Sequence, residues 1–255
     1  MGLKLTGFPV LQQHDVSAFA ARVTRLLARV EYRRADTEED KLAIYRMRHE
    51  AYVRSGGTEP RSSGIFSDHY DDDPNAWLIG VYLDGELAGS LRLHVGFGPD
   101  ASLPARTAFP EIIDPILQAG KAIIDGTRFV SAVSHARRFP ELPYITLRSS
   151  FVAEKYFNAD FMSAGCREEH QAFYKRMFGC GPWAPARTYP YLSQKIALVG
   201  YNCRELEEKT YARYPFLFSD AAEQERLFST SSNGARGADF IKGRRLLVEA
   251  SPGNP

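Results

Sequence analysis

The fold of this chain is decided by one stretch, residues 76–95, which read AWLIGVYLDGELAGSLRLHV. Two apolar runs flank the pair Asp84-Gly85, which favours the positive φ angles of a two-residue hairpin turn. The stretch therefore predicts antiparallel strands over 76–83 and 86–95. Arg92 lies inside the second run, where a buried charge is costly unless an opposite charge pairs with it. We therefore expect an acidic partner for Arg92 elsewhere in the chain.

Helices and strands alternate on both sides of this hairpin. Upstream, apolar periodicity predicts a helix over 14–30, a strand over 31–35 and a helix from Asp36 to about Gly56. Downstream, it predicts strands over 121–130, 160–166 and 189–199, and helices over 144–158, 167–178 and 204–230. The prolines of 96–119 predict a long connection with at most one helical turn. This order is that of a mixed α/β fold.

The chain divides into three predicted parts. Residues 31–203 form the α/β domain, and residues 1–30 form an N-terminal helical extension. Residues 204–255 form a C-terminal helical extension that ends in a mobile tail.

Composition narrows the class of protein. The 32 Lys and Arg residues nearly balance the 31 Asp and Glu residues, so a net charge of +1 argues against nucleic-acid binding by bulk charge. No apolar run reaches the roughly 18 residues of a membrane span, and the N-terminus lacks a signal-peptide pattern. The three cysteines (Cys166, Cys180 and Cys203) fit neither a disulfide framework nor a zinc site, which favours a cytoplasmic location.

Common nucleotide and hydrolase motifs are missing from the sequence. It contains no P-loop, no dinucleotide-binding glycine motif after a predicted strand, and no nucleophile elbow. The six histidines have no spacing that suits a zinc site. The sequence therefore predicts neither a metal nor a resident cofactor.

The most unusual local composition is the acidic loop of residues 66–75, which has four aspartates within six positions. One interpretation is a solvated loop that caps the next element. A second is a D-x-D site for Mg²⁺ or Mn²⁺, whose preferred ligands are hard oxygens. A third is that these acids pair with buried arginines, and Arg48, Arg92 and Arg128 are available for this on other predicted elements.

Four short motifs occur in a fixed order between residues 31 and 200. They are Arg48 with Tyr52 before the acidic loop, Asp68-His-Tyr-Asp71 within it, Gly89-Ser-Leu-Arg92 on the hairpin, and Asp125-Gly-Thr-Arg128-Phe129 on the next strand. In these motifs the chain resembles the GNAT-like acyltransferases that take a fatty acyl group from acyl carrier protein. The resemblance is closest to the long-chain N-acyl amino acid synthases, which are related to the acyl-homoserine-lactone (autoinducer) synthases.

The resemblance implies a GNAT-like (acyl-CoA N-acyltransferase) fold, with a mixed, largely antiparallel sheet flanked by helices. The central strands 121–130 and 160–166 would splay apart, and a pantetheine arm would enter between them. An acceptor carboxylate would be held by Arg48 or Arg92, because arginine can donate two parallel hydrogen bonds. The full set of implied substrate-binding residues is Arg48, Tyr52, Asp68, Asp71, Arg92 and Arg128.

Three positions depart from the autoinducer synthases. Phe66 stands where they usually have a Glu, the Trp expected near Glu59 is missing, and Asp125 replaces their usual Glu before Arg-Phe. These departures favour a plain amino acid or another amine over S-adenosylmethionine as the acceptor.

Three residues are candidates for proton transfer. Tyr174 matches a tyrosine that GNAT enzymes often use as general acid, although it could also be a core aromatic. His170 lies one turn earlier on the same helix face and could shuttle a proton near neutral pH, or it could be a structural or substrate-facing residue. Asp125 could act as a base through a water molecule, or it could pair with Arg128. Some apolar residues could line a tunnel for a long acyl chain or simply form core: Phe151, Val152, Tyr156, Phe157, Phe161 and Met162.

The acyl donor is predicted from a missing loop. CoA-dependent relatives need glycines after the first splayed strand, because backbone N–H groups there wrap a pyrophosphate. Residues 131–140, SAVSHARRFP, contain no glycine, which favours acyl carrier protein instead. Because carrier proteins are acidic, we expect a basic rim on the enzyme where the carrier docks. The predicted rim, for which scattered surface charge is the alternative, consists of Arg137, Arg138, Arg148 and Lys155.

The sequence therefore predicts an N-acyltransferase that moves a long-chain fatty acyl group from acyl carrier protein to the amino group of an amino acid. The phosphopantetheine thioester on that carrier is a co-substrate rather than a cofactor. Two alternatives stay open. One is an autoinducer synthase that uses S-adenosylmethionine, and the other is a non-catalytic GNAT-like module that binds carrier protein or lipid.

Overall fold

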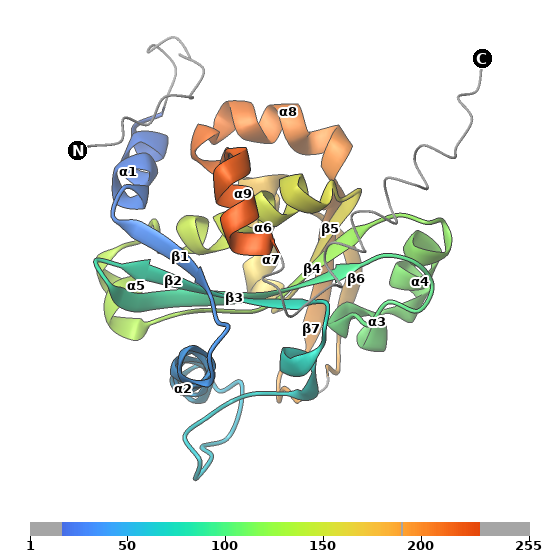
Figure 1. Cartoon of the computed structure of the whole chain (residues 1–255). Helices are drawn as coiled ribbons and strands as arrows, with labels where there is room; N and C mark the ends of the chain where they lie inside the picture. Colours follow the sequence, from blue (N-terminus) through green and yellow to red (C-terminus); the bar gives the residue numbers. More distant parts are fainter. Residues whose placement is uncertain (1–16, 190, 230–255) are drawn as a thin grey trace.

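A seven-stranded sheet runs through the molecule (Figure 1). The computed structural model describes residues 17–189 and 191–229. The strands are β1 (Val30–Arg34), β2 (Ala76–Leu83), β3 (Glu86–Gly96), β4 (Ile123–Ser131), β5 (Phe161–Cys166), β6 (Gly181–Arg187) and β7 (Ile196–Asn202). Their spatial order is β1-β2-β3-β4-β5-β7-β6, and every neighbouring pair is antiparallel except β4 and β5. The sheet is thus mixed and largely antiparallel, as the sequence predicts.

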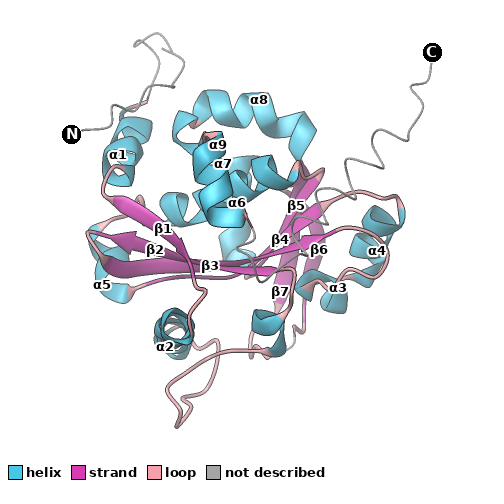
Figure 2. Cartoon of the chain, viewed as in Figure 1, coloured by secondary structure: helices cyan, strands magenta, loops and turns pink. Residues whose placement is uncertain are grey.

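Helices lie on both faces of the sheet (Figure 2). One face carries α2 (Glu38–Arg54), α3 (Pro104–Ala108) and α4 (Pro110–Gln118). The other carries α1 (Ala18–Leu27), α6 (Leu142–Phe157), α7 (Gln171–Phe178), α8 (Cys203–Arg213) and α9 (Ala221–Phe228). A short helix, α5 (Val133–Arg138), follows β4. Among the described residues no helix is long and apolar enough to cross a membrane.

Local sequence signals explain where the first elements begin and end. The β2–β3 hairpin turns at Asp84 and Gly85, whose φ angles are 52° and 86°, as the Asp-Gly pair predicts. The Thr37 side chain caps α2 by accepting a hydrogen bond from the Asp40 N–H. Acidic residues in the first turn of α2 further stabilise this end of the helix.

The two central parallel strands are paired along only part of their length. Residues 123–126 of β4 pair with residues 161–164 of β5, and the ladder stops there. On its other side, β4 shifts register against β3 between Ser90 and Arg92, and Arg128 in this bulge has a φ of 55°. A positive φ is uncommon outside glycine, and a bulge bends its strand. The splayed central strands expected from the resemblance are therefore present.

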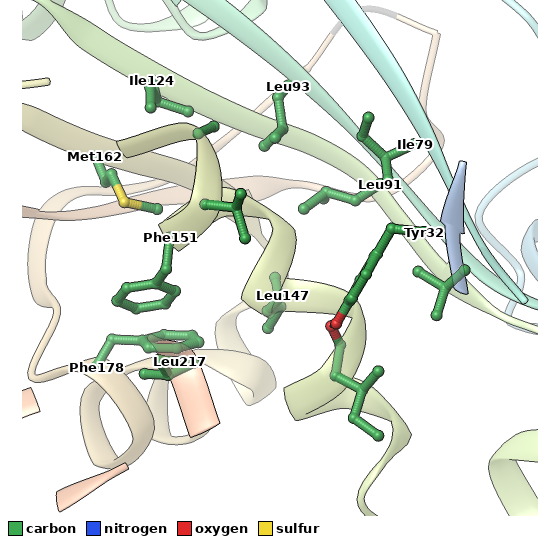
Figure 3. Packing of buried hydrophobic residues seen from close by; sticks show 14 of the residues in the cluster. Tyr32, Ile79, Leu91, Leu93, Ile124, Leu147, Phe151, Met162, Phe178 and Leu217 are labelled. Atoms are coloured by element: carbon green, nitrogen blue, oxygen red, sulfur yellow. The ribbon is translucent and has the colours of Figure 1, made fainter. Parts of the chain in front are cut away.

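Alternation along β4 separates two apolar clusters. Ile124 faces the larger cluster, which lies between α6 and the sheet and includes Leu91 and Phe151 (Figure 3). Ile123, the preceding residue, faces the smaller cluster beneath α3 and α4. The paired part of β4 is therefore covered by a helix layer on each face.

The structure differs from the predicted elements at several points. The strand expected over 189–199 is β7, which begins at Ile196, and neither α5 nor β6 is predicted. The connection 96–119 contains two helices, because Pro104 and Pro110 occupy first-turn positions where a missing N–H costs nothing. Residues 204–229 pack on α6 as α8, α9 and the 3-10 turn between them. The predicted lead-in before Ser17 and the predicted tail after Ser229 lie outside the described residues.

Candidate active site

Asp68 and Asp71 shape the acidic loop with their own side chains. The Asp68 carboxylate accepts a hydrogen bond from the Tyr70 N–H at 3.0 Å, and the Asp71 carboxylate accepts one from the Asp68 N–H at 3.0 Å. This reciprocal capping holds the 3-10 turn His69–Asp72 in place. Both carboxylates are thereby aimed at the sheet.

Three arginines from separate elements meet these two carboxylates. Arg92 Nη1 of β3 lies 2.6 Å from Asp68 Oδ1 and 3.0 Å from Asp71 Oδ1. Arg128 Nε of β4 donates to Asp68 Oδ2 at 2.9 Å, and Arg48 Nη1 of α2 donates to Asp71 Oδ1 at 2.7 Å. The third interpretation of the acidic loop, pairing with buried arginines, is therefore the one that the structure shows.

This five-residue cluster is buried and carries excess positive charge. Its side chains are at most 3% exposed. Burial alone raises the pKa of Asp68, but the charges and hydrogen bonds of Arg92 and Arg128 outweigh it and hold that pKa well below its ordinary value. Three guanidinium groups face two carboxylates, which leaves a net charge of +1. Arg48 shows the imbalance, because its Nε and Nη2 are buried and have no hydrogen-bond partner in the part of the chain that the structure describes.

A cavity of about 240 Å³ opens beside the cluster, where β4 and β5 separate. It is lined by α2 and its following loop, by residues 127–130 of β4, by residues 165–167 at the end of β5, and by α7 and the segment before β7. Of the six predicted substrate-binding residues, only Tyr52 and Arg128 line it. The other four (Arg48, Asp68, Asp71 and Arg92) stand behind Arg128 and fix its position. The prediction that Arg48 or Arg92 holds an acceptor carboxylate is wrong in this geometry, because both are at most 1% exposed and neither lines the cavity.

Two of the three predicted proton-transfer residues lie in the cavity wall. Tyr174 of α7 is buried and lines the cavity. Burial, followed by the nearby Cys166 and Cys180, raises its pKa well above the ordinary value, so it stays a neutral phenol. His170 is exposed on its outer side, and its Nε2 lies 3.3 Å from Arg167 Nη2. Partial burial and then the Arg167 charge lower its pKa, which favours the neutral imidazole.

Asp125 lies apart from this cavity. Its carboxylate accepts hydrogen bonds from the Ala105 N–H of α3 at 2.7 Å and from Ser163 Oγ at 3.1 Å. The expected pairing of Asp125 with Arg128 is wrong, because Arg128 pairs with Asp68 and Asp125 faces α3. Complete burial raises the pKa of Asp125 to about 6. It does not line the cavity, so any action as a base would need a relay.

Tyr189 is a cavity residue that the sequence did not reveal. It is 6% exposed, and its buried hydroxyl has no partner among the described residues. Burial, followed by the Asp125 charge, raises its pKa, while Arg128 and Arg92 oppose the rise. Tyr189 precedes β7 in a stretch with no recognisable motif, so no sequence signal could have found it.

The predicted docking rim divides into exposed and buried residues. Arg137 and Arg138 are exposed on α5, directly after β4. Lys155 is half-buried at the far end of α6, with its Nζ 4.9 Å from the centre of the Tyr211 ring. Arg148 is a wrong assignment, because it is 4% exposed and binds Glu223 and the carbonyls of Phe216 and Phe218. It anchors the C-terminal helices rather than a partner.

The expected metal alternative finds no support in the described residues. No group of three or more His, Cys, Asp or Glu side chains is placed there to share an ion. Asp68 and Asp71 are already engaged by guanidinium groups.

An open sheet with splayed central strands and a cavity at the opening defines a GNAT-type N-acyltransferase fold. Solved structures share this architecture at low sequence identity. FeeM, an N-acyl amino acid synthase from uncultured soil microbes, has a TM-score of 0.61 and 15% identity, over 74% of this chain and 98% of that one. The AHL synthase LasI has a TM-score of 0.55 and 14% identity, over 75% and 96%. TofI, in a complex with an inhibitor and MTA, has a TM-score of 0.52 and 12% identity, over 74% and 100%.

A family model gives the assignment within this fold. The model described as N-acyl amino acid synthase FeeM matches residues 43–202, which is more than half of the chain. The chain therefore belongs to the FeeM N-acyl amino acid synthase family and is an acyltransferase. No curated protein matches it.

Proposed function

We propose that this chain transfers an acyl group from acyl carrier protein to the amino group of an amino acid. The observation that carries the proposal is the cavity at the β4–β5 opening, which presents Arg128, His170 and Tyr174 together. Family membership supports the amino acid acceptor. The carrier-bound donor is supported by residues 131–140, where the short basic helix α5 stands in place of a glycine-rich loop.

The acceptor's carboxylate binds on Arg128 in this proposal. Arg128 belongs to a cluster with a net charge of +1, so an incoming carboxylate balances charge that the two aspartates leave over. Asp68 binds the Arg128 guanidinium at Nε and Nη2, so Nη1 is left to donate to the acceptor's carboxylate. Tyr52 and Tyr189 give the same end of the cavity aromatic walls.

The reaction then needs two proton transfers. The amine lone pair attacks the thioester carbonyl carbon, and neutral His170 accepts the proton that the amine loses. The tetrahedral intermediate collapses, the C–S bond breaks, and Tyr174 protonates the leaving thiolate. The imidazolium returns its proton to the phenolate through solvent, so the enzyme is restored. The backbone of β4 beyond Gly126 has no ladder partner on β5. In this proposal, an N–H group of that backbone lies beside the oxyanion.

In this proposal the reaction takes place in the cytoplasm, where acyl carrier protein would meet the enzyme, and three buried thiols suit a reducing compartment. In this proposal the thioester enters as a co-substrate, and neither a metal nor a resident cofactor takes part.

The test is an assay with acyl carrier proteins of several chain lengths and a panel of amino acids, read by mass spectrometry for N-acyl products. We expect Tyr174→Phe to lower kcat by about 100-fold or more with little change in KM, because only proton donation is removed. Tyr156→Phe is the control, since Tyr156 packs on Phe157 and Phe228 away from the cavity. Absence of product with every amino acid would overturn the proposal, and lactone release from S-adenosylmethionine would identify an autoinducer synthase.

A further inference from the structure

A second cavity lies next to the first, beneath α6, and the two share Tyr174. Its volume is about 30 Å³, which is space for roughly one or two water-sized groups. Gly126 and Ala164, the last paired residues of β4 and β5, line it, and so does Tyr174, which also lines the larger cavity. A thioester held at the strand opening would therefore send its acyl tail into this small apolar space.

Aromatic rings form the wall of the small cavity on the side of α6 and α7. Phe151 of α6 lies against Phe178 of α7, with ring centres 4.9 Å apart, and Met162 of β5 reaches toward them (Figure 3). All three residues line the cavity. A longer acyl chain could pass only by displacing these side chains.

A buried polar contact lies behind the rings. The Tyr201 hydroxyl lies 2.8 Å from Met162 Sδ and donates to Glu154 Oε2 at 3.3 Å. Glu154 is only 4% exposed, so displacing Tyr201 would remove a hydrogen bond from a buried carboxyl group. Tyr201 lines the cavity as well, and it fixes both Met162 and the end of the apolar space.

The C-terminal extension supports this closure from outside. Tyr211 of α8 packs edge-on against Phe151, with ring centres 6.1 Å apart. Lys155 covers the Tyr211 ring from α6. Residue 211 lies beyond residues 43–202, so this support comes from a part of the chain outside the family match.

Energetics favour a short tail over a long one. Each buried methylene gains about 0.8 kcal/mol. Forcing extra methylenes into a well-packed core costs about 1–3 kcal/mol, because side chains must leave their preferred rotamers. A chain that outgrows the small cavity meets this cost again at each side chain that it must displace, so the cost approaches the gain only when several side chains have to move.

We propose that Phe151, supported by Tyr201 and by Tyr211 of α8, restricts the donor to short acyl groups such as acetyl or butyryl. This inference rests on the proposed function and replaces the long-chain donor that the family resemblance implies. Phe151 acts here as a specificity-determining residue.

The test compares acetyl-, butyryl-, octanoyl- and palmitoyl-carrier proteins with the acceptor held constant. For the unmodified chain we expect kcat/KM with butyryl to exceed that with palmitoyl by about 100-fold. Phe151→Ala should raise the ratio of kcat/KM with octanoyl to kcat/KM with butyryl by about 10-fold or more. The matched control is Val152→Ala, because Val152 is the next residue of α6, is fully buried and lines neither cavity. It should leave the ratio unchanged, and Phe151→Leu serves if the alanine variant does not fold.

Two outcomes would overturn the inference while the proposed function stands. One is a preference of the unmodified chain for palmitoyl, and the other is an equal shift in the Val152→Ala control. Calorimetric titration with S-butyryl- and S-palmitoyl-pantetheine gives a readout that needs no turnover. Tighter binding of the butyryl compound would support the short pocket even if no amino acid were acylated.

Discussion

The two faces of the sheet at the β4–β5 opening are built on different principles. On the α2 face, five ionised side chains are held by hydrogen bonds whose directions and partners fix each group. On the α6 face, rings and a thioether fix the space mainly by volume, with the single buried hydroxyl of Tyr201 behind them. The charged face should therefore be sensitive to a change of charge at constant shape. The apolar face should instead be sensitive to a change of shape at constant polarity.

The charged face should show the largest effect. Asp68→Asn keeps the shape but removes the charge that Arg92 and Arg128 share. Breaking a buried pair leaves uncompensated charge, so we expect the free energy of unfolding to fall by about 3–5 kcal/mol. Urea denaturation measures it. Asp72→Asn is the control, because Asp72 is in the same loop but its side chain is 81% exposed, and it should change stability by less than about 0.5 kcal/mol.

The pH dependence of stability should isolate Asp125, the buried acid beside α3. Its folded pKa of about 6 lies above the ordinary 3.8, so its stabilising contribution is complete below the ordinary value and is lost as the pH rises through about 6. The loss reaches up to about 3 kcal/mol at neutral pH.

The measurement for Asp125 is the difference in unfolding free energy between the unmodified chain and Asp125→Asn from pH 4 to 7.5. Burial lowers the pKa of His94 to about 3, so its effect on stability has the opposite pH dependence. Because His94 is present in both proteins, its effect cancels in the difference. We expect Asp125→Asn to gain relative stability as the pH rises. Parallel pH profiles of the two proteins would contradict the raised pKa of the buried Asp125 carboxyl.

A smaller effect is expected for the charged anchor on the apolar face. Arg148→Met keeps the length of the side chain but gives up Glu223 and two carbonyl groups. Because the Glu223 side chain is 17% exposed and can reach water, we expect a loss of about 2 kcal/mol in thermal or urea unfolding. Arg138→Met on exposed α5 should change little. A loss as large as that of Asp68→Asn would remove the distinction between the two faces.

Local signals in the sequence predicted the β2–β3 hairpin and the charged cluster on the α2 face of the sheet. The Asp-Gly turn fixed the β2–β3 hairpin, and the costly position of Arg92 in a strand pointed correctly to an acidic partner. Arg48 and Arg128 were expected in the same cluster because each belongs to a short motif on a predicted helix or strand. Both form ion pairs in that cluster. Where a charge must be buried, its need for a partner can be read from sequence alone.

Other features depend on contacts between distant residues and could not be predicted in this way. Arg148 was expected on the docking rim because residues 121–155 hold six basic groups against three acids, but its partner Glu223 lies 75 residues away in the sequence. The strand β6, GPWAPAR, carries two prolines that normally argue against a strand. The pairing of Arg128 with Asp68 rather than Asp125 depends on the bulge in β4, which has no local signal.

The prolines of β6 have a consequence for solubility. β6 is an outer strand of the sheet, and Pro182 and Pro185 lack the N–H groups that a strand from another molecule would need. At the opposite border, β1 carries the exposed charges of Glu31 and Arg33. Both borders are thus poor templates for intermolecular strand addition, which protects a concentrated solution of this chain against aggregation through its sheet.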